Sequence, residues 1–163
     1  MKPVMLATDG SATAEKATAT AIDLARLLDT ELIVVSVWDV AYAGFGAMGF
    51  APISTNGDLA KLGEEEAGRI SVEAAACAEE AGVETRTVVL RGFPVEAICE
   101  AAEKFAPQFL VIGSHGWGAM KRAVFGSVST GVLHHASCPV MVVRGVAERA
   151  VAAANGAHES AEV

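Results

Sequence analysis

The strongest constraint on this chain is a regular alternation between short apolar runs and longer stretches in which apolar residues recur every three or four positions. The short runs are PVMLAT, ELIVVSVW, ETRTVVL, FLVI and VMVV, at residues 3–8, 31–38, 84–90, 109–112 and 140–143. The helical pattern covers residues 12–28, 58–81, a stretch from Pro94 onward, and 127–136. Strands separated by helices in this way predict an α/β fold with a parallel sheet that is covered on both faces.

Composition limits what such a domain does. The chain has 163 residues, of which 52% are hydrophobic, which is enough for one domain with a buried core. We expect this domain to span residues 1–145, and residues 146–163 to be a disordered tail. The net charge of −8 disfavours general nucleic-acid binding but allows a small anion at a local site. Because no membrane-length apolar stretch or signal-peptide pattern is present, we expect a soluble cytoplasmic protein.

The cysteines and histidines do not indicate a metal centre. Cys77, Cys99 and Cys138 form no CxxC pair, and the four histidines have no HExxH spacing. In the helix expected at residues 58–81, the apolar stripe consists of Ile70, Ala74, Cys77 and Ala81. Cys99 also falls on an apolar helix face, so we expect Cys77 and Cys99 to be buried as small hydrophobic side chains.

Ligands of open parallel sheets bind beyond the carboxyl ends of the strands, where the strand order reverses. The loops at those ends are residues 9–11, 39–57, 91–93 and 114–126. The second loop contains GFGAMG, in which Gly44, Gly46 and Gly49 have the GxGxxG spacing. This motif neither leaves its strand directly nor enters a helix, as the dinucleotide fingerprint requires, so we interpret it as a glycine-rich connection or a lid.

The loop after the fourth strand, within GSHGWGAMKRAVFGSVST, is the strongest candidate for a binding site. Gly113 closes the strand, Gly116 follows it, and Gly126 with Ser127 opens the last helix. A helix N-terminus offers unpaired N–H groups and a partial positive charge, which suit a phosphate. Ser127 is equally suitable as a helix cap and the glycines as turn residues, so residue chemistry leaves both interpretations open.

A second polar cluster, Thr8-Asp9-Gly10-Ser11, follows the first strand. Asp9 is either a turn residue or an acceptor for a ligand's hydroxyl or amino groups, or a partner for a metal ion bound to phosphate. Ser11 is a reasonable N-cap for the helix at residues 12–28. If the first and fourth strands are neighbours, the two clusters face each other across one crevice.

The sequence resembles the universal stress protein family over nearly all of residues 2–144. The resemblance rests on LATDGS, VVSVWD, VIGSHG and GSVSTGVLHHASCPVMVV, and on the spacing Gly113-x2-Gly116-x9-Gly126-Ser127, which is similar to that of the family's ATP-binding branch. It implies a doubly wound five-stranded parallel sheet of order 3-2-1-4-5, of the adenine-nucleotide alpha-hydrolase-like type. Two positions depart from the family pattern, Gln108 in place of aspartate and Ser36 in place of histidine.

The resemblance also implies roles for particular residues. The segment that contacts adenine and ribose corresponds to Ala7, Thr8 and Asp9, and the position whose backbone reads the adenine edge corresponds to Val37. The floor under the nucleotide corresponds to Ile112 and Gly113, and a loop residue that approaches phosphate corresponds to His115. The segment that cradles the triphosphate corresponds to Gly116, Gly126, Ser127, Val128 and Ser129.

The implied ligand is ATP with Mg²⁺, and the strand Val140–Val143 matches the one through which family members form antiparallel homodimers. These features predict a regulatory stress-response protein that acts as a nucleotide-dependent dimer, without nucleic-acid or membrane partners. The alternative is a slow ATP hydrolase or a phosphoryl- or adenylyl-transfer enzyme, although the spacing of Asp9, His115 and Lys121 requires no catalytic role. A dimeric scaffold without nucleotide is a third hypothesis, and the glycine–serine motif counts against it.

Overall fold

A computed structural model describes residues 1–39, 58–115 and 126–144. Its strands are β1 (Val4–Ala7), β2 (Leu32–Trp38), β3 (Thr85–Arg91), β4 (Phe109–Gly113) and β5 (Val140–Val143). Its helices in these ranges are α1 (Ala12–Leu28), α3 (Asp58–Glu80), α4 (Pro94–Phe105) and α5 (Ser127–His135). Each predicted strand and helix is confirmed, with ends shifted by a residue or two where they differ.

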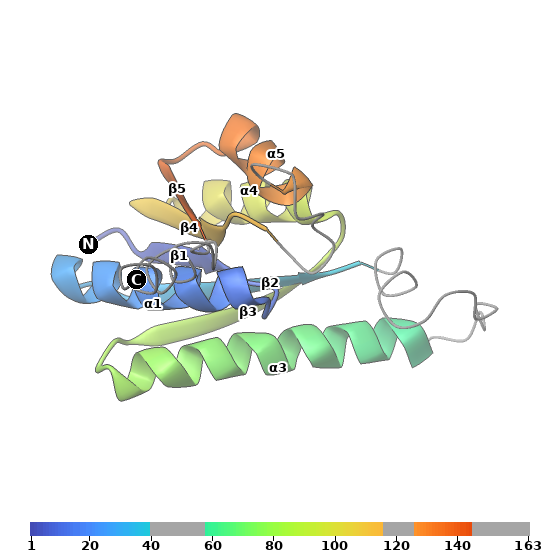
Figure 1. The fold of residues 1–163 in the computed structure, drawn as a ribbon, viewed down its shortest axis with the longest axis horizontal. Helices are drawn as coiled ribbons and strands as arrows, with labels where there is room; N and C mark the ends of the chain where they lie inside the picture. Colours follow the sequence, from blue (N-terminus) through green and yellow to red (C-terminus); the bar gives the residue numbers. More distant parts are fainter. Residues whose placement is uncertain (40–57, 116–125, 145–163) are drawn as a thin grey trace, which may run out of the picture.

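The strands form one sheet of order β3-β2-β1-β4-β5, in which every neighbouring pair is parallel (Figure 1). This is the predicted order 3-2-1-4-5. The last residue of β1, Ala7, lies opposite Val35 of β2 and Ile112 of β4. The connection after β1 leads to β2 on one side of the β1–β4 pair, and the connection after β4 leads to β5 on the other side. The carboxyl ends of β1 and β4 therefore form the switch point at which such sheets bind ligands.

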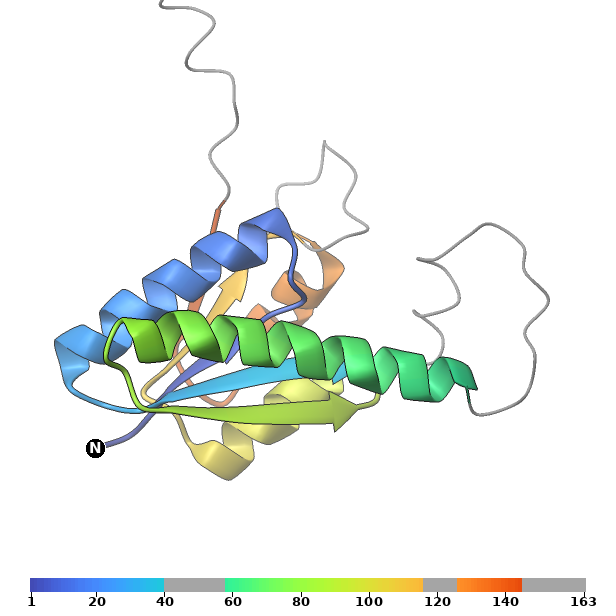
Figure 2. The same cartoon turned by 90° about the horizontal axis from the view of Figure 1, so that it is seen from below.

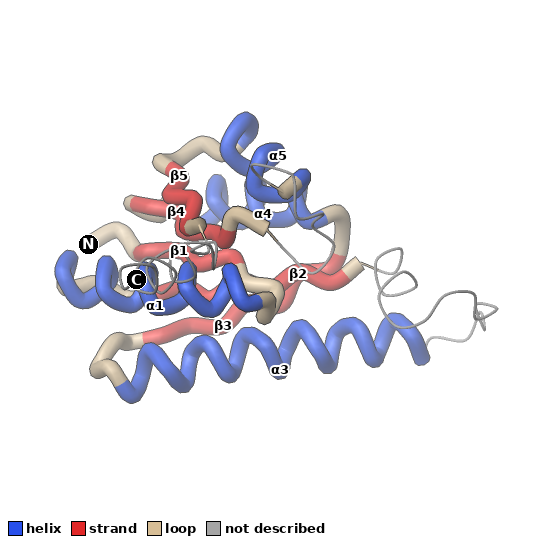
Figure 3. Tube along the Cα trace, in the orientation of Figure 1, coloured by secondary structure: helices blue, strands red, loops and turns tan. Residues whose placement is uncertain are grey.

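Alternate residues of the central strand face two helical layers. Val4 and Leu6 pack with α1 and α3, whereas Met5 and Ala7 pack with α4 and α5. Figure 2 shows α1 and α3 together on one face of the sheet, and Figure 3 shows helices on both faces. Because β1 is covered on both faces, as predicted for the sheet, all four of its residues are buried.

The prediction for Cys77 is wrong, because this side chain is exposed, and Cys99 is only half-buried. Of the predicted stripe, Ala74 is buried, but the rest of the buried face of α3 consists of other small side chains, namely Ala67, Ser71, Ala75 and Ala78. One residue along a helix turns the side chain by about 100°. Cys77 therefore lies beside the contact face, since the alanines, rather than the larger apolar residues, pack against the sheet.

Several predictions concern residues outside the described part of the chain. They include the GFGAMG segment, Gly116, the basic pair Lys121 and Arg122, and the tail at 146–163. Within residues 1–39, 58–115 and 126–144, no helix has both the length and the apolar character needed to cross a membrane.

Candidate functional site

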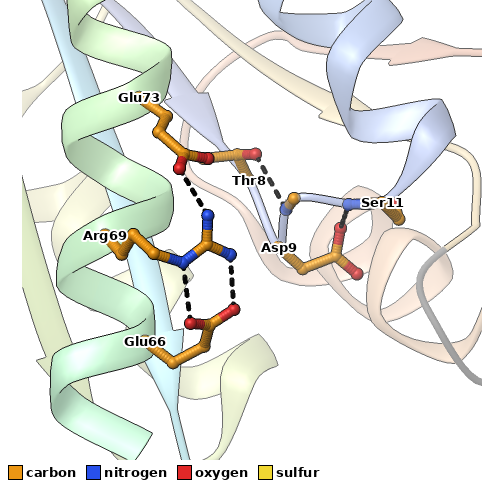
Figure 4. A network of polar contacts seen from close by, with 7 residues as sticks. Thr8, Asp9, Ser11, Glu66, Arg69 and Glu73 are labelled. Carbon is orange, nitrogen blue, oxygen red and sulfur yellow. Dashed lines mark hydrogen bonds and ion pairs between the residues drawn. The ribbon is translucent and has the colours of Figure 1, made fainter.

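The polar segment after β1 is a tight turn at the carboxyl edge of the sheet. The Ser11 N–H donates to Asp9 Oδ1 at 3.0 Å, and the Gly10 N–H donates to Thr8 Oγ1 at 3.3 Å (Figure 4). Gly10 has φ +71°, and a β-carbon there would lie 3.1 Å from Ile70 Cγ1 of α3, so both backbone and packing favour glycine. The turn sets the position of the Asp9 carboxylate, which lies directly beyond the end of β1.

Ser11 begins α1, as predicted. Its hydroxyl accepts a hydrogen bond from the Ala14 N–H at 3.3 Å, which is the usual contact of a serine N-cap. This cap positions the first turn of α1 beside the end of β4.

Gly113, the last residue of β4, allows the backbone of α1 to lie close to the end of that strand. A β-carbon on Gly113 would lie 3.0 Å from the carbonyl carbon of Thr13 and 3.1 Å from the nitrogen of Ala14. Both atoms belong to the backbone of α1, which does not move as easily as a side chain. The glycine that the family resemblance assigns to the floor of a nucleotide site is thus also required by the packing of α1 against β4.

The carbonyl oxygen of Ser114 binds two donors from the start of α5. The Gly126 N–H donates to it at 2.7 Å, and the Ser129 hydroxyl donates at 3.1 Å. The same hydroxyl lies 3.0 Å from the Gly126 carbonyl oxygen, and Ser129 is only 3% exposed. The single hydroxyl proton of Ser129 is therefore engaged within the protein.

The carbonyl oxygen of His115 binds two donors from the start of α1. These are the hydroxyls of Ser11, at 3.3 Å, and of Thr13. We refer to the four hydrogen bonds on the Ser114 and His115 carbonyl oxygens as the carbonyl clamp. The His115 ring is also held, because its Nδ1 lies 2.9 Å from the Ser114 hydroxyl. The clamp links the N-termini of α1 and α5 through one short segment after β4.

The N-terminus of α5 lies at this edge of the sheet. Its N-cap is Gly126, with extended backbone angles (φ −70°, ψ 161°) and no side-chain hydrogen bond to the first turn. The first-turn N–H groups of Ser127, Val128 and Ser129 point back along the helix axis and have no partner within the helix. Together with the helix dipole they provide a positive end suited to an anion.

The strand residues that the resemblance assigns to the adenine and to the floor under the nucleotide occupy adjoining strand ends. Ala7 and Ile112 are buried and lie opposite each other in the β1–β4 pair. The Val35 carbonyl accepts from the Thr8 N–H at 3.0 Å. Backbone groups two residues apart in a strand point to the same side, so the N–H and C=O of Val37 face the space beyond the end of β1.

Sequence reasoning missed Arg69, which lies on α3 across from the turn at Asp9 (Figure 4). Its guanidinium binds Glu66 through two hydrogen bonds, of 2.8 and 2.6 Å, and also binds Glu73. The hydrogen bonds from Arg69 lower the pKa of Glu66. The spacing of these residues by three and four positions along a helix was the available signal.

The described part of the chain contains no group of three or more His, Cys, Asp and Glu side chains arranged to hold a metal ion.

The model of the universal stress protein family matches residues 1–144 of the chain. Universal stress protein MJ0531 of Methanocaldococcus jannaschii is 33% identical over 144 residues, which are 88% of this chain and 82% of the relative.

Two solved structures share the fold over nearly their whole length. The structure of hypothetical protein MJ0577 superposes with a TM-score of 0.76 at 26% identity, covering 88% of this chain and 96% of that one. A universal stress protein in complex with cAMP superposes with a TM-score of 0.62 at 26% identity, covering 87% and 96%. The sheet order, the motif positions and the matched length agree, and the chain belongs to the universal stress protein family.

Proposed function

We propose that this protein binds ATP at the carboxyl edge of β1 and β4, with the phosphates at the N-terminus of α5. The observation that carries the proposal is the first turn of α5, which follows a glycine N-cap and presents N–H groups without partners in the helix next to the switch point. A relative of the same fold was solved in complex with cAMP, which supports an adenine nucleotide as the ligand class.

The proposed contacts follow the geometry of the edge. The base and ribose lie against the end of β1 and beside the backbone of Val37, and Asp9 accepts hydrogen bonds from the ribose hydroxyls. The residues proposed to contact the nucleotide are Ala7, Thr8, Asp9, Val37, Ile112, Gly113, His115, Gly116, Gly126, Ser127, Val128 and Ser129. Ser129 contributes through its backbone N–H, because its hydroxyl donates to the Ser114 and Gly126 carbonyls. Mg²⁺ is carried on the phosphates.

The proposed role is regulatory, in a cytoplasmic stress response, with the nucleotide controlling a homodimer formed through β5. In the described sheet β5 is an edge strand, paired with β4, and its four residues are half-buried apolar side chains. An apolar edge of this kind promotes association unless it is covered, and a second copy of the strand covers it.

The test is to identify by mass spectrometry what co-purifies with the protein and to measure its melting temperature with and without ATP. A ligand that binds only the folded state stabilises it by about 2.7 kcal/mol at 100 times its Kd. We expect an adenine nucleotide in the purified protein or an ATP-dependent rise in melting temperature. Absence of both contradicts the proposal. Phosphate release of many turnovers per minute would instead favour the ATP hydrolase.

A further inference from the structure

The carbonyl clamp connects the two halves of the proposed nucleotide site. On one side, the turn at Asp9 leads into α1 through Ser11. On the other side, Gly126 begins α5. The segment 113–115 lies between them, and each of its last two carbonyl oxygens is held by a different helix. The distance and orientation of the two helix N-termini therefore depend on these hydrogen bonds.

The Ser11 and Thr13 hydroxyls both donate to the His115 carbonyl oxygen, but they make different additional contacts. The Ser11 hydroxyl also accepts from the Ala14 N–H as the N-cap of α1, so its replacement would disturb the helix start as well. The Thr13 hydroxyl donates to His115 O and lies 3.3 Å from the Ser11 hydroxyl. Thr13 is half-buried in the first turn of α1, and the cap hydrogen bond from the Ala14 N–H goes to Ser11 and not to Thr13. Thr13 is thus the donor that can be removed with the least effect on the fold.

We propose that Thr13 is a positioning residue of the nucleotide site, which acts through the His115 carbonyl and sets the place of the phosphate end of the site relative to Asp9. This inference rests on the proposed function. Without the Thr13 hydroxyl, the His115 carbonyl oxygen loses one of the two hydroxyl donors, Ser11 and Thr13, that hold it to the start of α1. Ser114 and His115, which hold Gly126, then sample more orientations, and nucleotide binding must order them.

Loss of the Thr13 hydroxyl should affect mainly the binding of the phosphates. The Ser114 carbonyl, which receives the Gly126 N–H at 2.7 Å, belongs to the residue next to His115, so a change at His115 is passed directly to the α5 N-cap. The base end is held separately, by the β1–β2 and β1–β4 pairing. Loss of the Thr13 hydroxyl should therefore weaken the binding of ATP more than the binding of adenosine.

The experiment compares Thr13→Val, which keeps the shape and removes the hydroxyl, with Thr13→Ser, which keeps the hydroxyl. The matched control is Thr20→Val on the same helix, where the hydroxyl donates to the Lys16 carbonyl at 2.9 Å on the exposed surface. Thr13→Ala replaces Thr13→Val if the latter does not fold. Calorimetric titration of each full-length protein gives the Kd for ATP and for adenosine, and thermal melting confirms folding.

We expect Thr13→Val to weaken ATP about tenfold, with adenosine within about twofold of the parent, and Thr13→Ser and Thr20→Val to bind both ligands like the parent. Parent-like ATP affinity in Thr13→Val overturns the inference and leaves the proposed function standing. An equal loss of affinity for ATP and for adenosine also overturns the inference. A failure of Thr13→Ser to bind ATP like the parent does the same. If the parent binds neither ligand, the proposed function itself is wrong, and the role given to Thr13 fails with it.

Discussion

The Gly126 N–H donates a 2.7 Å hydrogen bond to the carbonyl oxygen of Ser114, which joins the first residue before α5 to the first residue after β4. Eleven residues separate Ser114 from Gly126 along the chain, and 116–125 lie outside its described part. The hydrogen bond holds the N-terminus of α5 at the carboxyl edge of the sheet. This relationship underlies the predictions on nucleotide binding.

A negative charge in the first turn of α5 should prevent nucleotide binding without harming the fold. Ser127 is exposed there, and an aspartate would repel the phosphates while interacting favourably with the helix dipole. We expect Ser127→Asp to weaken ATP by about tenfold or more, with a melting temperature equal to or above the parent's. Ser127→Asn, of similar size and neutral, is the matched control. Equal ATP affinity in both variants, measured by calorimetry, would contradict the placement of the phosphates.

A side chain at Gly113 should destabilise the fold by forcing β4 and α1 apart. The β-carbon of Gly113→Ala would lie 3.0 Å from the Thr13 backbone, and such overpacking costs about 1–3 kcal/mol. Gly68→Ala is the control, because no atom lies within 4 Å of a β-carbon at that position in α3. Alanine should stabilise the helix there by about 0.5–1 kcal/mol. Urea unfolding measures both changes, and an unchanged midpoint for Gly113→Ala would refute the packing argument.

Dimer formation through β5 should depend on the backbone N–H of Val142. Hydrogen bonds from Leu110 N–H to Pro139 O, at 2.9 Å, and from Ser114 N–H to Val143 O, at 2.8 Å, show which side of β5 faces β4. By alternation, the Val142 N–H points away from β4.

The variant Val142→Pro therefore removes an outward donor and keeps the β4–β5 ladder. Sedimentation should show a dimer for the parent with ATP and a monomer for the variant. A dimer that survives the substitution would place the interface elsewhere.

The three cysteines should differ in their rate of alkylation. Burial raises the pKa of the Cys99 and Cys138 thiols, which lowers their thiolate fraction near neutral pH. Cys77 is exposed on α3. Brief treatment with iodoacetamide at pH 7.5, followed by peptide mass mapping, should label Cys77 first. Faster labelling of Cys99 or Cys138 would contradict the observed burial.

Local pattern was sufficient to predict the elements of this fold but not all of its contacts. Short apolar runs and helical stripes located each described strand and helix, because burial on both faces of the sheet leaves a strong signal in the sequence. Strand order came from the resemblance, since pairing joins residues that are far apart in the chain, such as Ala7 and Ile112. The side of α3 was misjudged at Cys77, because alanines carry its buried face.

The candidate site was predicted in its motifs but not in its supporting contacts. Asp9 and Gly126 were singled out, and the structure brings their segments to one edge of the sheet. The sequence pattern predicts Thr13 only as part of a helix, since nothing in the local sequence shows that its hydroxyl meets a carbonyl 102 positions away. Gly113 likewise owes its packing requirement to α1, which only the folded chain shows.

The central claim is that nucleotide phosphates bind the first turn of α5, and amide chemical shifts during ATP titration test it most directly. The N-terminus of α4 is an internal control, because it follows β3 at the same edge and its N-cap, Phe93, also lacks a side-chain hydrogen bond. We predict large shifts for the amides of Ser127, Val128 and Ser129 and none for Val95 and Glu96. Shifts confined to α4, or absent from both helices at saturating ATP, would contradict the account.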